Sequence, residues 1–147
     1  MTIDDIQDAD EMDAADVWHR SGLAAYPYLP TWQTLTLEKA GWIFRHVVRV
    51  ECDIWVGTLD GRVVAYLAMK GSQLNRLYVD PAEWRKGWGK RVVVLAKHLS
   101  PTGLELQTHQ ENDAARALYE KHGFTAVKFG VSPPPESAPD VEYHWRP

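Results

Sequence analysis

The stretch Val79-Asp80-Pro81-Ala82-Glu83-Trp84-Arg85-Lys86-Gly87-Trp88-Gly89-Lys90 gives the strongest indication of fold and chemistry in the chain. An apolar run ends at Asp80-Pro81, because proline cannot donate to a strand ladder, and a helical pattern begins after the glycines. A helix start offers unpaired main-chain N–H groups and a partial positive charge, and glycine lets an anion approach closely. Arg85, Lys86 and Lys90 add side-chain charge. The stretch therefore predicts a phosphate-binding turn between a strand and a helix.

The same residues exclude two common phosphate loops. A Walker loop requires Gly-Lys-Ser/Thr after four intervening residues, which this stretch lacks, and a dinucleotide-binding fingerprint requires a third small residue where Val92 stands. Gly87-Trp88-Gly89 taken alone is also compatible with a tight turn whose basic neighbours are simply solvated. A second motif is needed to distinguish these interpretations.

Helical and strand-like patterns alternate on both sides of the turn. Apolar residues at helical spacing predict helices over residues 8–25, 36–47, 92–99 and 112–122, with Thr36 as an N-cap. Alternation around Asp60-Gly61 predicts a hairpin, and further strands are expected at 74–79, 104–108, 124–129 and 141–145. The proline-rich residues 131–140 are expected to form a stiff connection. This order is typical of a single α+β or mixed α/β domain over residues 1–147.

The second motif follows the next predicted strand and reads Asn112-x-x-Ala115-x-x-x-Tyr119-x-x-x-Gly123-Phe124. Together with the glycine turn, it resembles the signature of the GCN5-related N-acetyltransferase (GNAT) family. That family has a Gln/Arg-x-x-Gly-x-Gly/Ala loop before a helix, and here Trp84 occupies the position of the leading Gln or Arg. The resemblance implies a GNAT fold: a central, mostly antiparallel, twisted sheet of six or seven strands flanked by four helices.

The resemblance also implies an acetyl-CoA-dependent N-acetyltransferase that transfers an acetyl group directly to a primary amine, without a metal. The pantetheine arm is expected to pair with the main chain of the central strand in a gap between two splayed strands, since its amides can imitate a strand edge. A bulge near Leu77 or Tyr78 is expected to present an N–H group to the acetyl oxygen. The cofactor-binding residues implied are Leu77, Tyr78, Val79, Arg85, Lys86, Gly87, Trp88, Gly89, Lys90, Asn112 and Ala115. Asn112 has the alternative role of capping its own helix.

Tyr119 is the expected catalytic acid, because a phenol beside the sulfur can protonate a leaving thiolate whose thiol has a pKa near ~8.5. The alternative for Tyr119 is a packing role in the core. A general base is harder to assign, and the sequence leaves Glu51, Asp53, Glu105, His109 and ordered water as candidates. A different class of protein, a catalytically silent acyl-CoA sensor acting through a partner, also fits the motifs.

Composition narrows the remaining possibilities. The formal net charge of -4 argues against nucleic acid as a ligand, and no apolar stretch is long enough to cross a membrane. The acidic first residues do not resemble a secretion signal, and one cysteine, Cys52, cannot form an intramolecular disulfide. A cytoplasmic protein with acetyl-CoA and an amine as partners is therefore expected, with a homodimer as an option. The N-terminal tryptophans are expected to pack in the core, or alternatively to wall an acceptor pocket.

Overall fold

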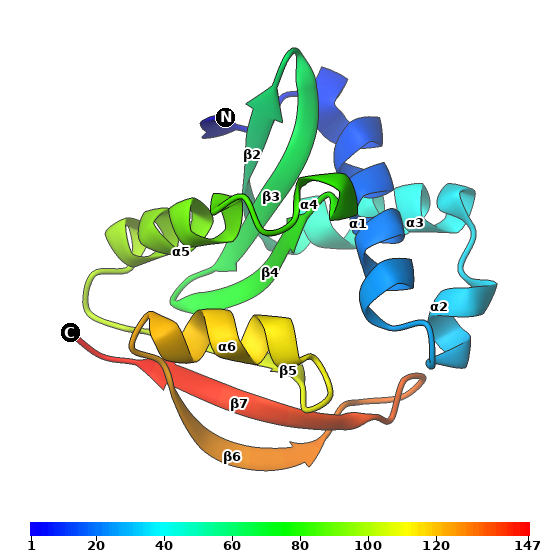
Figure 1. Cartoon of the computed structure of the whole chain (residues 1–147). Coiled ribbons are helices and arrows are strands. Elements are labelled where there is room, and N and C mark those ends of the chain that lie inside the picture. The colour runs from blue at the N-terminus through cyan, green and yellow to red at the C-terminus, as the bar shows by residue number, and fades with distance from the viewer.

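The computed structural model describes all 147 residues and contains a seven-stranded sheet with helices on both faces (Figure 1). The strands are β1 (Thr2–Asp5), β2 (Asp53–Leu59), β3 (Arg62–Lys70), β4 (Gln73–Val79), β5 (Leu104–His109), β6 (Thr125–Val131) and β7 (Pro139–Trp145). The helices are α1 (Glu11–Ala25), α2 (Pro30–Thr34), α3 (Leu37–Ile43), α4 (Arg49–Glu51), α5 (Trp88–Leu99) and α6 (Asp113–Lys121). Three short segments complete the chain: η1 (Asp8–Asp10), η2 (Phe44–Val48) and η3 (Pro81–Glu83).

The strand order is β1-β2-β3-β4-β5-β7-β6, and every neighbouring pair is antiparallel except β4 and β5. The parallel pair is also the weakest, because Gln73 and Glu105 are its only paired residues. Beyond that point β4 and β5 diverge, and the gap between them opens toward their carboxyl ends. The mostly antiparallel sheet and the splayed central strands were both expected from the sequence.

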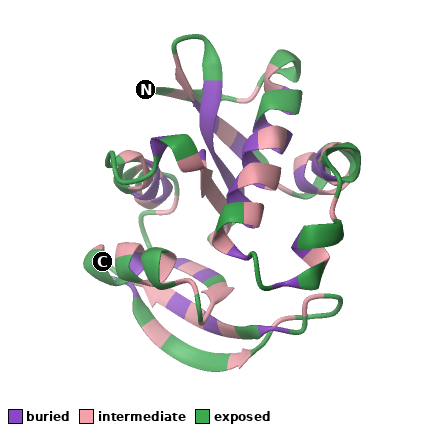
Figure 2. Ribbon diagram, turned by 45° about the vertical axis from the view of Figure 1, so that its right-hand side comes forward, coloured by how far each residue is buried: buried purple, intermediate pink, exposed green.

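Two hydrophobic clusters lie on opposite faces of the sheet. On β3, Tyr66 and Ala68 join the cluster formed with α1, α2 and α3, whereas Ala65, Leu67 and Met69 join the cluster formed with α5 and α6. This division follows from the two-residue period of a strand, whose side chains alternate between faces. Figure 2 shows the buried residues along the centre of the sheet, whereas the outermost strand β6 is largely exposed.

The predicted elements are present, with two additions. Thr36 caps α3, and its hydroxyl accepts a hydrogen bond from the N–H of Lys39 at 3.1 Å. β1 was not expected from the sequence, because its Thr-Ile-Asp-Asp segment carries one apolar residue and is held by main-chain pairing to β2. α2, a single turn that begins at Pro30, was not expected either. None of the helices combines the length and apolar composition needed to cross a bilayer.

The expected position of the bulge on β4 was wrong. Ala68 faces Arg76 and the next residue, Met69, faces Leu74, so Asn75 is the extra residue on β4. The bulge therefore precedes Leu77 and Tyr78 rather than coinciding with them. A bulge bends its strand and increases the local twist. The bulge at Asn75 follows Gln73, the residue of β4 that pairs with β5, and so accounts for the divergence of the two strands beyond that point.

Candidate functional site

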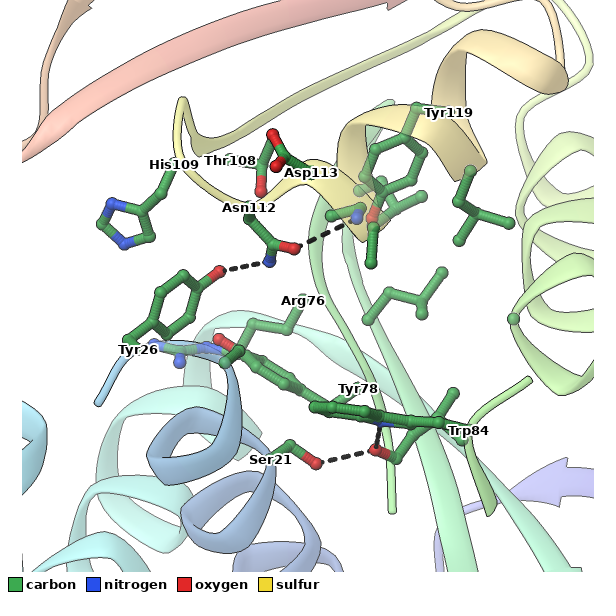
Figure 3. Close-up of a pocket in the computed structure, with 18 of the residues that line it drawn as sticks. Ser21, Tyr26, Arg76, Tyr78, Trp84, Thr108, His109, Asn112, Asp113 and Tyr119 are labelled. Carbon is green, nitrogen blue, oxygen red and sulfur yellow. Dashed lines mark hydrogen bonds between the residues drawn. The ribbon is translucent and has the colours of Figure 1, made fainter. Parts of the chain in front are cut away.

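A cavity of about 810 Å³ occupies the gap between β4 and β5. It extends from the turn before α5 to the side chains of α1, α2 and the β6–β7 loop, so it opens on both faces of the sheet. Every predicted site residue except Lys86 lines it. Figure 3 shows Tyr119 and Trp84 on one side of this cavity and Tyr26 and His109 on the other.

The turn from Arg85 to Lys90 presents a row of main-chain donors. No main-chain hydrogen bond in the structure is donated by an N–H group of residues 85–90, and the first bond of α5 runs from Arg91 N to Gly87 O. Gly87 has φ +83°, a conformation that an L side chain rarely adopts. A Cβ on Gly89 would lie 3.2 Å from Leu118, so glycine also allows α6 to approach. This arrangement suits the oxygens of a phosphate or diphosphate.

Lys86 points away from the cavity. Its ammonium lies 3.2 Å from Glu83, a buried carboxylate that also accepts a hydrogen bond from Trp88 Nε1 at 3.3 Å. Lys86 therefore fixes the shape of the turn through Glu83, and within this turn the basic side chains that line the cavity are Arg85 and Lys90. The assignment of Lys86 as a direct cofactor contact is not supported by this geometry.

Asp80, at the end of β4, joins the turn to α1. Its carboxylate is 1% exposed and accepts hydrogen bonds from Arg20 at 2.7 Å, Arg62 at 3.3 Å and the N–H of Ala82 at 3.0 Å. Burial raises the pKa of this carboxyl, but the donors outweigh burial and hold the pKa below its usual value. A charged Asp80 is therefore part of the folded structure at neutral pH.

The free edge of β4 is available to a ligand at two residues. Asp80 N donates to Val64 O, and the alternation of an antiparallel ladder then directs the polar groups of Val79 and Leu77 away from β3. Those groups face the gap that β5 has left. Tyr78, one residue out of phase, directs its main chain toward β3 and lines the cavity through its side chain.

Trp84 occupies part of this edge. Its indole N–H donates to Val79 O at 2.7 Å, and the hydroxyl of Ser21 donates to the same oxygen at 2.8 Å. Both bonds are drawn in Figure 3. The N–H of Val79 and both main-chain groups of Leu77 remain as the points at which an extended ligand can pair. The replacement of the family's Gln or Arg by Trp84 therefore changes the cavity wall as well as its charge.

Asn112 serves as the N-cap of α6. Its Oδ1 accepts from the N–H of Ala115 at 3.1 Å, and its Nδ2 donates to the hydroxyl of Tyr26 at 2.9 Å. Both polar atoms are thus engaged within the protein, in agreement with the capping alternative considered for the sequence. Asn112 and Ala115 still line the cavity, so their contribution is to position α6 and Tyr26 around it.

Tyr119 projects from α6 into the cavity. Its ring packs against Phe124 and Tyr143, with centroid separations of 5.4 and 6.2 Å, and the residue is 6% exposed. No hydrogen bond within the protein involves its hydroxyl group. Burial raises the pKa of this phenol well above its ordinary value, and the neighbouring phenols of Tyr26 and Tyr78 add to the effect. Tyr119 therefore stays protonated in neutral solution and can donate to an atom in the cavity.

Among the candidate bases, only His109 lines the cavity. Glu51 and Asp53 lie outside it, and Glu105 sits at the closed end of the gap, where the hydroxyl of Ser72 donates to it at 2.7 Å. His109 Nε2 lies 2.7 Å from Oε2 of Glu136, and its Nδ1 is buried without a partner. The contact with His109 lowers the pKa of Glu136, so the pair resembles a carboxylate that orients an imidazole.

Among the cavity residues that the sequence did not indicate are Tyr26, Arg76 and Glu136. Tyr26 follows α1 in a Tyr-Pro-Tyr segment that indicated only a helix end, and Glu136 lies in the proline-rich connection. Arg76 lies on β4, directly after the bulge. No local pattern marks these residues, because they come together from distant parts of the chain. Of the N-terminal tryptophans, Trp18 and Trp32 pack in the core, and Trp32 also lines the cavity. The expectation of core packing was wrong for Trp42, which is exposed.

The comparisons with known proteins agree with this architecture. The model of the acetyltransferase (GNAT) domain matches residues 50–126. The peptidyl-lysine N-acetyltransferase YjaB of Salmonella typhimurium is 29% identical over 109 residues, which cover 74% of this chain and 72% of that protein. The chain belongs to the GNAT family of acetyltransferases, and it is an N-acetyltransferase with the mixed α/β fold of that family.

Solved structures show the same fold. Apo YjaB of Escherichia coli superposes with a TM-score of 0.76 at 21% identity, covering 98% of this chain and 96% of that one. A GCN5-related N-acetyltransferase from Rhodopseudomonas palustris gives a TM-score of 0.81 at 17% identity, covering 99% and 95%. PaiA N-acetyltransferase of Thermoplasma acidophilum, in complex with coenzyme A, gives 0.72 at 17% identity and covers both chains fully.

Proposed function

We propose that this chain binds acetyl-CoA in the gap between β4 and β5 and transfers the acetyl group directly to a primary amine. The observation that carries the proposal is the continuity of the cavity. One cavity joins the unpaired N–H groups of residues 85–90, the free edge of β4 and the hydroxyl of Tyr119. These features match the diphosphate, the amide-bearing arm and the sulfur of acetyl-CoA in that order.

Each residue has a defined role in this proposal. Acetyl-CoA supplies an activated acetyl group as a thioester. The N–H groups of residues 85–90 and the charges of Arg85 and Lys90 hold the diphosphate, and Leu77 and Val79 pair with the arm. The N–H of Leu77, directed into the gap, is available to the acetyl oxygen.

Two side chains move protons. A lysine-like amine has a pKa near ~10.4, so removing its proton at pH 7 costs about 4.6 kcal/mol and calls for a base. His109 Nε2 lies 2.7 Å from the carboxylate of Glu136, and its Nδ1, which has no partner within the protein, is the atom proposed to accept that proton. Tyr119 retains its own proton and donates to the sulfur. The base and the acid thus lie on opposite sides of the cavity.

The acceptor is proposed to be a primary amine. YjaB is named as a peptidyl-lysine N-acetyltransferase, so the lysine side chain is one of the amines to test. The aromatic side chains of Tyr26, Trp32 and Tyr78 line the part of the cavity that α1 and α2 cover, where the acceptor amine is proposed to bind.

Thiol release from acetyl-CoA over a panel of primary amines tests the proposal, with a thiol-reactive dye as the readout. We expect release that depends on the amine, and binding of coenzyme A detectable by calorimetry. Coenzyme A binding without amine-dependent release would indicate a sensor rather than a working enzyme. Absence of binding heat together with absence of release would refute the assigned cavity.

A further inference from the structure

Arg76 lies in the cavity on the side that α1 and α2 cover. It follows the bulge at Asn75 and faces Ala68 on β3, which belongs to the cluster packed against the N-terminal helices. Its guanidinium lies 4.9 Å from the ring of Trp18, and Figure 3 shows its side chain beside Tyr26. Arg76 is thus separated from the turn before α5 that suits a diphosphate.

No carboxylate lies within ion-pair distance of Arg76. The other partly buried arginines have acidic partners: Arg20 lies 2.7 Å from Asp80, and Arg49 lies 2.6 Å from Glu11. Arg76 takes part in none of the ion pairs within 4.0 Å, and its Nε is buried without a hydrogen-bond partner. Since a guanidinium is always protonated in proteins, the cavity wall carries a permanent positive charge.

The neighbours of Arg76 do not supply the missing negative charge. Burial raises the pKa of the Tyr66 and Tyr78 phenols and of the Cys52 thiol, so all three remain neutral at pH 7. Glu136 is the acidic group on this side of the cavity, and the charge of Arg76 contributes to lowering its pKa, but its carboxylate contacts His109 and forms no ion pair with Arg76. The ring of Trp18 compensates only part of the cost of burying a cation.

We propose that Arg76 binds a carboxylate of the acceptor, so that the acceptor is a small amine that also carries a carboxylate, as an α-amino acid does. This inference rests on the proposed function. A guanidinium offers a planar pair of donors that matches a carboxylate, and the cavity places it together with His109 and Glu136, which can receive an ammonium group. The two charges of an amino acid thus meet two groups of opposite charge. A lysine side chain within a peptide has no carboxylate to offer Arg76.

Matched acceptors test the inference in the unmodified enzyme. L-phenylalanine is compared with phenylalanine amide and 2-phenylethylamine, L-leucine with 3-methylbutylamine, and a blocked lysine peptide represents protein acceptors. We expect kcat/KM to be about 10- to 150-fold higher for each amino acid than for its partner without a carboxylate, the range for a charge-assisted hydrogen bond. Equal rates within each pair, or a preference for the peptide, would overturn the inference while leaving the proposed function intact.

Variants of Arg76 provide the second arm. Arg76→Gln is expected to lower kcat/KM for the amino acids by the same factor. It should leave kcat/KM for the decarboxylated amines and the affinity for coenzyme A unchanged. Arg76→Lys is expected to retain part of the activity that Arg76→Gln loses. Arg91→Gln is the matched control, since Arg91 also lies over a tryptophan, at 5.7 Å from the Trp88 ring, but outside the cavity. An equal loss for both acceptors of a pair would show a structural role for Arg76.

Equilibrium binding keeps the test independent of turnover and of the variant's stability. Calorimetry with N-acetyl-L-phenylalanine and with N-acetyl-2-phenylethylamine measures how the unmodified enzyme discriminates between the corresponding products. Tighter binding of the carboxylate by about tenfold or more supports the inference even if no amine is turned over. Equal affinity for the two compounds contradicts it.

Discussion

Replacing Tyr119 by Phe removes one oxygen atom from the cavity and nothing from the core. The ring contacts with Phe124 and Tyr143 remain, and no hydrogen bond within the protein is lost, because the hydroxyl has no partner there. We therefore expect the free energy of unfolding to change by less than about 0.5 kcal/mol. The affinity for coenzyme A is expected to stay within about twofold.

Turnover is expected to respond differently. A general acid contributes about 10²- to 10⁴-fold to a rate, which corresponds to about 2.7–5.4 kcal/mol of transition-state stabilisation. Steady-state kinetics of thiol release should show this loss in kcat. The raised pKa keeps Tyr119 protonated. Deprotonation of Tyr119 should therefore not lower the rate of the unmodified enzyme at any pH below ~10, the ordinary pKa of a tyrosine.

Tyr143→Phe is the matched control. Its hydroxyl accepts from Arg116 Nε at 3.0 Å and donates to Glu120, away from the cavity, so this substitution should lower stability by about 1–2 kcal/mol and leave kcat unchanged. Unchanged turnover in Tyr119→Phe, with the protein folded and coenzyme A bound, would remove Tyr119 from the mechanism.

Two further predictions concern the proposed base and the carboxylate that joins the turn to α1. His109→Gln should lower kcat by about 10²-fold at neutral pH, and part of the loss should be recovered at alkaline pH, where the amine deprotonates by itself. The control His98→Gln, at an exposed position, should leave kcat unchanged. The measurement is the pH–rate profile of each variant, and an unchanged profile in His109→Gln would exclude His109 as the base. Asp80→Asn should lower the free energy of unfolding by about 2–3 kcal/mol. Because the folded-state pKa of Asp80 is depressed, its stabilisation is present above the unfolded value near ~3.9 and lost as pH falls through the folded value, so thermal melts of the unmodified protein and the variant should converge in acid.

The sequence predicted those features that are encoded locally. The glycine turn, Asn112 with its alternative role as a helix cap, and the tyrosine seven residues later are set by short-range spacing, and the structure places them around one cavity. The strand β1 was missed because an edge strand needs only main-chain pairing, which its sequence does not display. The bulge was placed too far along β4 because its extra residue is Asn75, a residue type that does not mark a bulge.

The acceptor side of the cavity could not be predicted for a different reason. Arg76, His109 and Glu136 belong to β4, β5 and the β6–β7 loop, and only the tertiary fold brings them into one wall. The sequence supplied His109 as one of several possible bases, and the structure separates it from the others by location. The arrangement of charges across the cavity depends on the tertiary fold, so no residue spacing in the sequence predicts it.

The single paired position between β4 and β5 divides the sheet into a four-stranded half and a three-stranded half. Few ladder bonds cross the line between β4 and β5, and the hydrophobic cluster formed with α5 and α6 contains residues from both halves. A long, amide-rich molecule lying between these strands restores hydrogen bonds that the polypeptide itself lacks. Binding of such a molecule should therefore slow amide hydrogen exchange in β4 and β5 together.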